Sequence, residues 1–135
     1  MRGHGVAGIV ALLVGLAAVP AVAHHSFSAE YDANKPVKLT GKVIEMRWTN
    51  PHAWIHIAVK GKDGKVVNWA CETGGANALY RRGWRKEDLV AGTQLVVDGY
   101  QARNGTSTAN ATSITFTDGR KLFAGSSQGA TTSGK

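Results

Sequence analysis

AWIHIAVKGKDGKVVNWACE, residues 53–72, contains two β-strand patterns separated by a turn. In residues 53–60, one face carries only aliphatic side chains, and the other face carries Trp54, His56 and Ala58. This alternation is typical of a strand with one face in a core. Asp63-Gly64 favours a tight hairpin turn because glycine readily adopts the positive φ that such a turn needs. The stretch therefore predicts an antiparallel hairpin whose second strand is 66–72. The expected inward residues of its first strand are Ala53, Ile55, Ile57 and Val59.

Further strand patterns lie on both sides of this hairpin. Residues 74–82 contain no β-branched side chain and are followed by Gly83, so this segment predicts a short helix. Residues 86–89 are expected to add one more helical turn. Strands are expected at 37–48, 93–102 and 109–117, with a short edge strand at 121–123.

The expected elements follow the order of three strands, one helix and two strands. This is the order of the OB-fold, a five-stranded barrel. We therefore expect a mainly β domain over residues 37–124, a five-stranded OB-like barrel with one short helix between strands 3 and 4. A helix-free sandwich is the alternative, but it needs about seven strands. Besides the hairpin residues, the expected core contains Leu95, Val97, Ile114 and Phe116.

The first 23 residues have the features of a secretory signal peptide. Arg2 supplies a positive charge, an apolar run of 14 residues follows at 6–19, and Ala21-Val22-Ala23 has the small side chains that a signal peptidase recognises. The run is shorter than the about 20 residues that a membrane-spanning helix needs. We expect cleavage after Ala23, a periplasmic location and no stable membrane insertion of the mature chain. A retained membrane anchor is the alternative.

Two further segments are expected to lie outside the barrel. Residues 24–36 are polar and lack periodicity, so they predict an N-terminal arm. Residues 125–135 are Gly, Ser, Thr, Gln, Ala and Lys, with no large apolar side chain. Such a segment buries too little apolar surface to offset the entropy of ordering, and it predicts a disordered tail.

Charge and cysteine content limit the classes of partner. The chain carries a formal net charge of +7 and one cysteine, Cys71. A basic exported protein is attracted to anionic surfaces, although positive charge also serves solubility. We expect no nucleic-acid partner, because the protein is expected to be exported and the sequence shows no reason for nucleic-acid binding outside the cytoplasm. One cysteine excludes an internal disulfide.

Five short motifs are spread over most of the chain after residue 22. They are Ala23-His24-His25-Ser26-Phe27, Trp48-Thr49-Asn50-Pro51-His52, Asn68-Trp69-Ala70, Arg81-Arg82-Gly83-Trp84 and Asp118-Gly119-Arg120-Lys121-Leu122-Phe123. Together they resemble a family of small exported bacterial proteins that is classed as a domain of unknown function. The resemblance implies a periplasmic location and a small β-rich domain, and it implies no particular reaction or ligand.

Four histidines after residue 23 are candidate metal ligands. If cleavage follows Ala23, the free α-amine and the imidazole of His24 can chelate one ion together, and amine and imidazole nitrogens suit Cu(II). His25 adds a second imidazole, and His52 or His56 can complete the set. This arrangement resembles the N-terminal histidine brace of copper proteins. The alternative is that these histidines are turn and surface residues, with His52 hydrogen-bonded to the barrel rim.

Aromatic side chains form a second candidate site. Trp54 and His56 share one face of their strand, and if that face is open to solvent they can form a binding platform. Trp48 and Trp69 are expected on neighbouring strands and can join the platform. The alternative is that these tryptophans fill the core or the rim.

The sequence lacks two common patterns of metal sites. It contains no His-Glu-x-x-His and no paired cysteines. We expect a non-catalytic periplasmic module that binds a small ligand or a metal, with Cu(II) at the N-terminal histidines. The alternative is an envelope interaction or stress protein that binds an unknown periplasmic protein through an aromatic, basic surface, without metal. An enzyme with a redox copper site is a third class.

Overall fold

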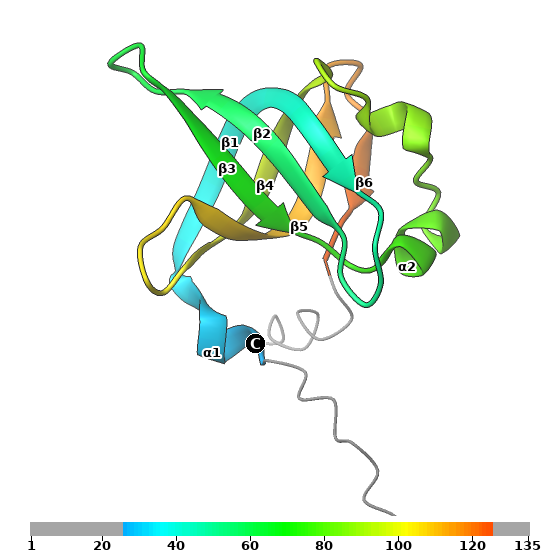
Figure 1. Ribbon diagram of the computed structural model, residues 1–135, viewed down its shortest axis with the longest axis horizontal. Coiled ribbons are helices and arrows are strands. Elements are labelled where there is room, and N and C mark those ends of the chain that lie inside the picture. Colours follow the sequence, from blue (N-terminus) through cyan, green and yellow to red (C-terminus); the bar gives the residue numbers. More distant parts are fainter. Residues whose placement is uncertain (1–25, 126–135) are drawn as a thin grey trace, which may run out of the picture.

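The computed structural model describes residues 26–125, which form six strands and three short helical segments (Figure 1). The predicted signal peptide, His24 and His25, and residues 126–135 of the predicted tail lie outside the described residues. No helix within residues 26–125 is long and apolar enough to cross a membrane. The elements are α1 (Phe27–Glu30), β1 (Tyr31–Arg47), β2 (Trp54–Lys60), β3 (Val66–Glu72), α2 (Ala76–Arg81), η1 (Lys86–Leu89), β4 (Gln94–Ala102), β5 (Thr108–Phe116) and β6 (Lys121–Phe123).

The strands form one sheet that closes into a ring. Their order is β3-β2-β1-β4-β5-β6, and β3 also pairs with β5 in parallel. All other pairings are antiparallel. The helix α2 lies between β3 and β4 in the chain, so the predicted OB-like barrel is confirmed, with β6 as an added edge strand.

The core lies inside this ring and is built from the inward face of each strand. Ile57 has no exposed surface and pairs with Val43 on one side and Trp69 on the other. Val59 is only half-buried, because the β1–β2 pairing ends at Gly41 and Val59. The other predicted core residues are buried: Ala53, Ile55, Leu95, Val97, Ile114 and Phe116.

The predicted start of the first strand is wrong. β1 begins at Tyr31 rather than at 37, and one helical turn, α1, precedes it. The alternation is hidden because residues 33–36 are all exposed and the β1–β4 register shifts between Tyr31 and Pro36. Buried Tyr31 pairs with Ala102, and the Phe27 ring packs on the rings of Tyr31 and Tyr100.

The turn between β1 and β2 holds the helix α2 in place. The carbonyl oxygen of Thr49 accepts the Ala76 N–H at 3.0 Å, and Asn50 Oδ1 accepts the Asn77 N–H at 3.1 Å. These contacts satisfy helix-end N–H groups that have no partner within the helix. Trp48 stacks on Tyr80 with ring centroids 5.2 Å apart. Trp48, Thr49 and Asn50 therefore have structural roles, and the turn that they form fixes the position of His52.

Candidate functional site

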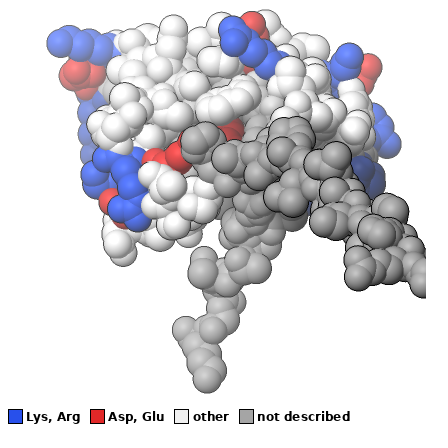
Figure 2. All heavy atoms as spheres, turned by 60° about the horizontal axis from the view of Figure 1, so that its bottom comes forward, with Lys and Arg blue, Asp and Glu red and all other residues white. Residues whose placement is uncertain are grey.

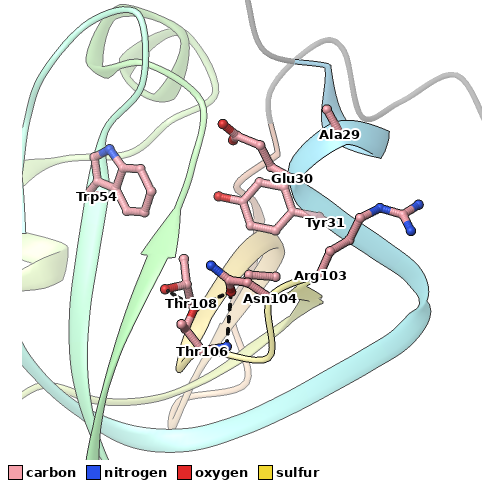
Figure 3. A pocket seen from close by; sticks show the side chains of 9 residues that line it. Ala29, Glu30, Tyr31, Trp54, Arg103, Asn104, Thr106 and Thr108 are labelled. Atoms are coloured by element: carbon pink, nitrogen blue, oxygen red, sulfur yellow. Dashed lines mark hydrogen bonds between the residues drawn. The ribbon is translucent and has the colours of Figure 1, made fainter.

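A pocket of about 360 Å³ opens at the end of the barrel where α1 lies. It is formed by segments that are far apart in the sequence: α1, the starts of β1 and β2, and the turn between β4 and β5 (Figure 3). Trp54 stands on one side, and Tyr31 and the turn residues face it across the space. Its lining residues are Ala29, Glu30, Tyr31, Trp54, Ala102, Arg103, Asn104, Thr106 and Thr108.

The β4–β5 wall of the pocket is stiffened by its own hydrogen bonds. Asn104 Oδ1 accepts the backbone N–H of Thr106 at 3.1 Å and its hydroxyl at 2.7 Å. Gly105 has φ of +74°, which glycine adopts without strain. The Gln101 side-chain amide donates to the carbonyl oxygens of Gly105 and Thr106. The wall is therefore formed before any ligand binds, and the Asn104 amide nitrogen points toward Trp54.

Arg103 joins this wall to α1. Its backbone N–H donates to the Glu30 carbonyl oxygen at 2.8 Å, and its Nε donates to the Ser28 carbonyl oxygen at 2.7 Å. The guanidinium extends away from Trp54 (Figure 3). Arg103 thus holds α1 against the β4–β5 turn, so that the part of the pocket opposite Trp54 is tied together.

A buried carboxylate lies beside the pocket. Glu72, the last residue of β3, accepts the Tyr31 hydroxyl, and His52 Nδ1 lies 3.0 Å from Glu72 Oε1. Burial and the neighbouring Glu72 carboxylate raise the pKa of the Tyr31 hydroxyl above its usual value. Tyr31 therefore stays protonated and donates to Glu72 over the physiological pH range.

The same carboxylate fixes the tautomer of His52. The Nδ1 atom of His52 faces Glu72 and the Thr73 carbonyl oxygen, and both of these groups accept hydrogen bonds. Nδ1 therefore carries a proton, and the lone pair of the neutral ring is on Nε2. The side chain is 32 % exposed, and Nε2 has no hydrogen-bond partner among residues 26–125. The contact between His52 and the barrel rim, which we expected as the alternative to metal binding, is present.

The structure describes two of the four predicted metal ligands, His52 and His56. His24 and His25 precede the described residues. His52 contacts Glu72, whereas His56 Nε2 lies 4.0 Å from Glu45 Oε1. Within residues 26–125 no group of three His, Cys, Asp or Glu side chains is placed to hold a metal ion.

The three predicted aromatic residues do not form one platform. Trp54 pairs with Glu72 on the outer face of the β2–β3 hairpin, together with His56. Trp69 pairs with buried Ile57, so its side chain is on the inner face and packs against the core. Trp48 also packs on the core and stacks on Tyr80. The register of β2 with β3 puts Trp54 and Trp69 on opposite faces, although their strands are neighbours.

Cys71 is part of the core. It has no exposed surface and pairs with Ile55 inside the barrel. Burial raises the pKa of its thiol to about 12. The thiol is therefore protonated at neutral pH and is a poor nucleophile and metal ligand.

Several residues of the pocket were not predicted from the sequence. Nothing in the sequence shows that the turn at Asn104-Gly105 faces Trp54, or that Tyr31 and Glu30 line the same pocket. The buried position of Glu72 was not predicted either. The available signal was its place at the end of the apolar strand 66–72, because carboxylates are rarely buried.

Charged side chains are spread over the surface. Figure 2 shows the face that carries α1, where the Lys and Arg side chains lie around the periphery in separate groups, several of them beside acidic residues. The described part of this face does not form one continuous basic patch. The net charge alone therefore does not mark this end of the barrel as a binding surface for polyanions.

The fold and the pocket define a small OB-like barrel with a ligand-sized pocket at one end. The chain belongs to a family of unknown function, DUF6152, whose model matches residues 12–111. This confirms the resemblance to an uncharacterised domain family that the motifs indicated. No match to a curated protein was found.

Proposed function

We propose that this protein is a non-catalytic binding module whose ligand is a small polyhydroxylated molecule of the saccharide kind. The observation that carries the proposal is the pocket of about 360 Å³ between Trp54 and the β4–β5 turn. Its volume lies in the range of ordinary small-molecule sites, about 300–1,000 Å³. The predicted signal peptide at residues 1–23 supports a periplasmic location within this proposal.

The chemistry of the walls supports a ligand with one apolar face and several hydroxyl groups. The indole of Trp54 offers a flat apolar surface. The Asn104 Oδ1 is engaged by Thr106, so its amide NH₂ group remains as a donor that faces Trp54. Glu30 and the Thr108 hydroxyl add polar groups around the same space. A sugar ring presents its C–H groups to an aromatic face and its hydroxyls to amides and carboxylates.

The position of the pocket on the barrel supports the same class of ligand. Trp54 belongs to β2, and Asn104 belongs to the β4–β5 turn. In OB-fold proteins the face of strands 2 and 3 and the loop between strands 4 and 5 bind oligosaccharides or oligonucleotides. By this fold-level analogy the pocket supports a saccharide ligand, which also suits the Trp54 ring and the Asn104 amide.

Fluorescence titration of the chain that starts at His24 tests this function. N-acetylglucosamine, galactose and glucose disaccharides are the probes, and Trp54 is the reporter. Trp54→Ala, read by calorimetry, is expected to weaken binding at least about tenfold, or about 1.4 kcal/mol. His56→Ala is the matched control, because His56 lies two positions along the same outer face and does not line the pocket. Equal losses in both variants, or no binding of any probe, would contradict the proposal.

A second candidate, Cu(II) binding, is favoured by the orientation of His52. Histidines that bind metals usually donate their other ring N–H to a carboxylate or carbonyl, as His52 Nδ1 does to Glu72 and Thr73. Its Nε2 is thereby available as one imidazole ligand, and in this candidate the amine and imidazole of His24 supply the others after cleavage. A chain of contacts leads from α1 through Tyr31 and Glu72 to His52.

Calorimetry with Cu(II) on the chain that starts at His24 tests this candidate. One extra residue before His24 removes the α-amine from the site and should lower affinity strongly, whereas His56→Ala should have little effect. Glu72→Gln should lower affinity about 10–100-fold by releasing His52. Affinity should also fall as the pH drops, because the amine and the imidazoles must be deprotonated. Binding that is unchanged by the extra residue would exclude a role for the amine.

A further inference from the structure

The β2–β3 hairpin projects beyond the barrel as a free two-stranded ribbon (Figure 1). The pairing of β1 with β2 ends at Val59, and the pairing of β5 with β3 begins only at Ala70. Between these points β2 and β3 pair with each other. Every residue of 60–68 is exposed. The ribbon therefore adds little to the core, and its composition needs another explanation.

The tip of this ribbon combines positive charge with exposed apolar side chains. Three lysines lie within six residues, at positions 60, 62 and 65. Asp63 is the acidic residue among them, and its Oδ1 accepts the backbone N–H of Lys65 at 3.0 Å, so it serves the turn. Val66 is 61 % exposed and Val67 is 44 % exposed. Val66 pairs with Lys60 and Val67 pairs with Val59. Because successive residues of a strand point to opposite sides, the two valines are on opposite faces of the ribbon.

We propose that this hairpin tip docks the protein on an anionic lipid surface. The lysine ammonium groups contact lipid phosphates, and the two valines enter the headgroup region from either side of the ribbon. Basic residues beside apolar ones are the combination that holds peripheral proteins at anionic membranes. The shape of the tip supports a lipid over a protein partner. A stable protein interface needs about 800 Å² on each side, which a convex ribbon of nine residues does not offer as one face.

Docking by the tip leaves the pocket open. Trp54 is the first residue of β2 and Lys60 is the last, so about 20 Å of strand separates the pocket from the tip. A protein held by its hairpin therefore presents the pocket end away from the lipid. The docking surface and the ligand site are separate, and each can be tested without the other.

Vesicle flotation with the chain that starts at His24 tests the proposal. The probes are vesicles of phosphatidylglycerol mixed with phosphatidylethanolamine, and vesicles of phosphatidylcholine alone. Binding is expected only to the first kind, and it should weaken as salt is added. Each lysine at the surface is expected to contribute about fivefold, so the triple replacement by Gln should weaken binding about a hundredfold. That variant is Lys60→Gln, Lys62→Gln and Lys65→Gln.

Two further variants separate the hairpin from net charge. A control triple changes net charge equally on other elements and should lose less than about tenfold. Its replacements are Lys35→Gln, Lys86→Gln and Lys121→Gln. Val66→Ser with Val67→Ser keeps the charge of the tip and should make the remaining binding weaker and more sensitive to salt. Because all these side chains are exposed, the melting temperatures should be unchanged.

Three outcomes would overturn the proposal. Equal losses in both lysine triples would show that net charge, and not the hairpin, attracts the vesicles. Equal binding to phosphatidylcholine would show that the anionic headgroup is not recognised. An absence of vesicle binding, with or without retention on an acidic protein, would exclude a lipid surface as the partner of this hairpin.

Discussion

Replacing Tyr31 with Phe should destabilise the protein by about 2 kcal/mol. The variant keeps the ring that packs on Phe27 and removes only the hydroxyl that donates to Glu72. A hydrogen bond to a charged group contributes about 1.5–3 kcal/mol net, and the remaining partner is a buried carboxylate. His52 still faces Glu72 from the other side, which places the expected loss in the lower half of that range.

Urea unfolding followed by tryptophan fluorescence measures this loss, and Tyr100→Phe is the matched control. The Tyr100 ring also packs on Phe27, but its hydroxyl has no hydrogen-bond partner among residues 26–125. The control should therefore lose less than about 0.5 kcal/mol. The double variant Tyr31→Phe with Glu72→Gln should lose less than the sum of the two single losses, because the two groups share one contact. Equal effects of Tyr31→Phe and Tyr100→Phe would refute the role assigned to the buried carboxylate.

Three further predictions concern the barrel. Ile57→Ala should cost about 2–5 kcal/mol in denaturant melts, because Ile57 is fully buried in the ring; a loss below about 0.5 kcal/mol would contradict its inward position. Gly99→Ala should cost about 1–3 kcal/mol or prevent folding, since a Cβ there would lie 2.1 Å from the Asn110 carbonyl oxygen; a wild-type melting temperature would show that the strands can move apart. Burial raises the pKa of Cys71 from 9.0 to about 12, so its contribution to stability is complete below about pH 9 and declines by about 1.4 kcal/mol per pH unit up to about pH 12. Melting curves of Cys71→Ala should show a smaller decline between pH 9 and pH 10, and an identical decline would mean that the thiol is not responsible.

Local patterns were enough to predict most of the barrel. The alternation in residues 53–60 and the turn at Asp63-Gly64 define the β2–β3 hairpin, and the lack of β-branched residues in 74–82 indicates the helix α2. Each of these signals lies within about ten residues. The start of β1 was missed because Asn34 and Pro36 are exposed there and interrupt the alternation.

The candidate site could not be predicted in the same way. Its walls come from α1, β2 and the β4–β5 turn, which are brought together only when the sheet closes. Whether Trp69 faces the core or the solvent depends on its register with Ile57, and the sequence of one strand does not contain that register. The contact of His52 with Glu72 likewise joins residues from two different strand ends.

The pairing of Tyr31 with Ala102 has a consequence for how the chain reaches its native state. The first and the fourth strand must meet across about seventy positions before the ring can close, and contacts between such distant segments make folding slow. A chain that ends before β5 exposes an unpaired edge of β4 and an unpaired edge of β3. Such edges are templates for aggregation. Because β5 follows β3 and β4 in the chain, the ribosome makes it last of the three, and both edges stay without their partner until β5 has emerged.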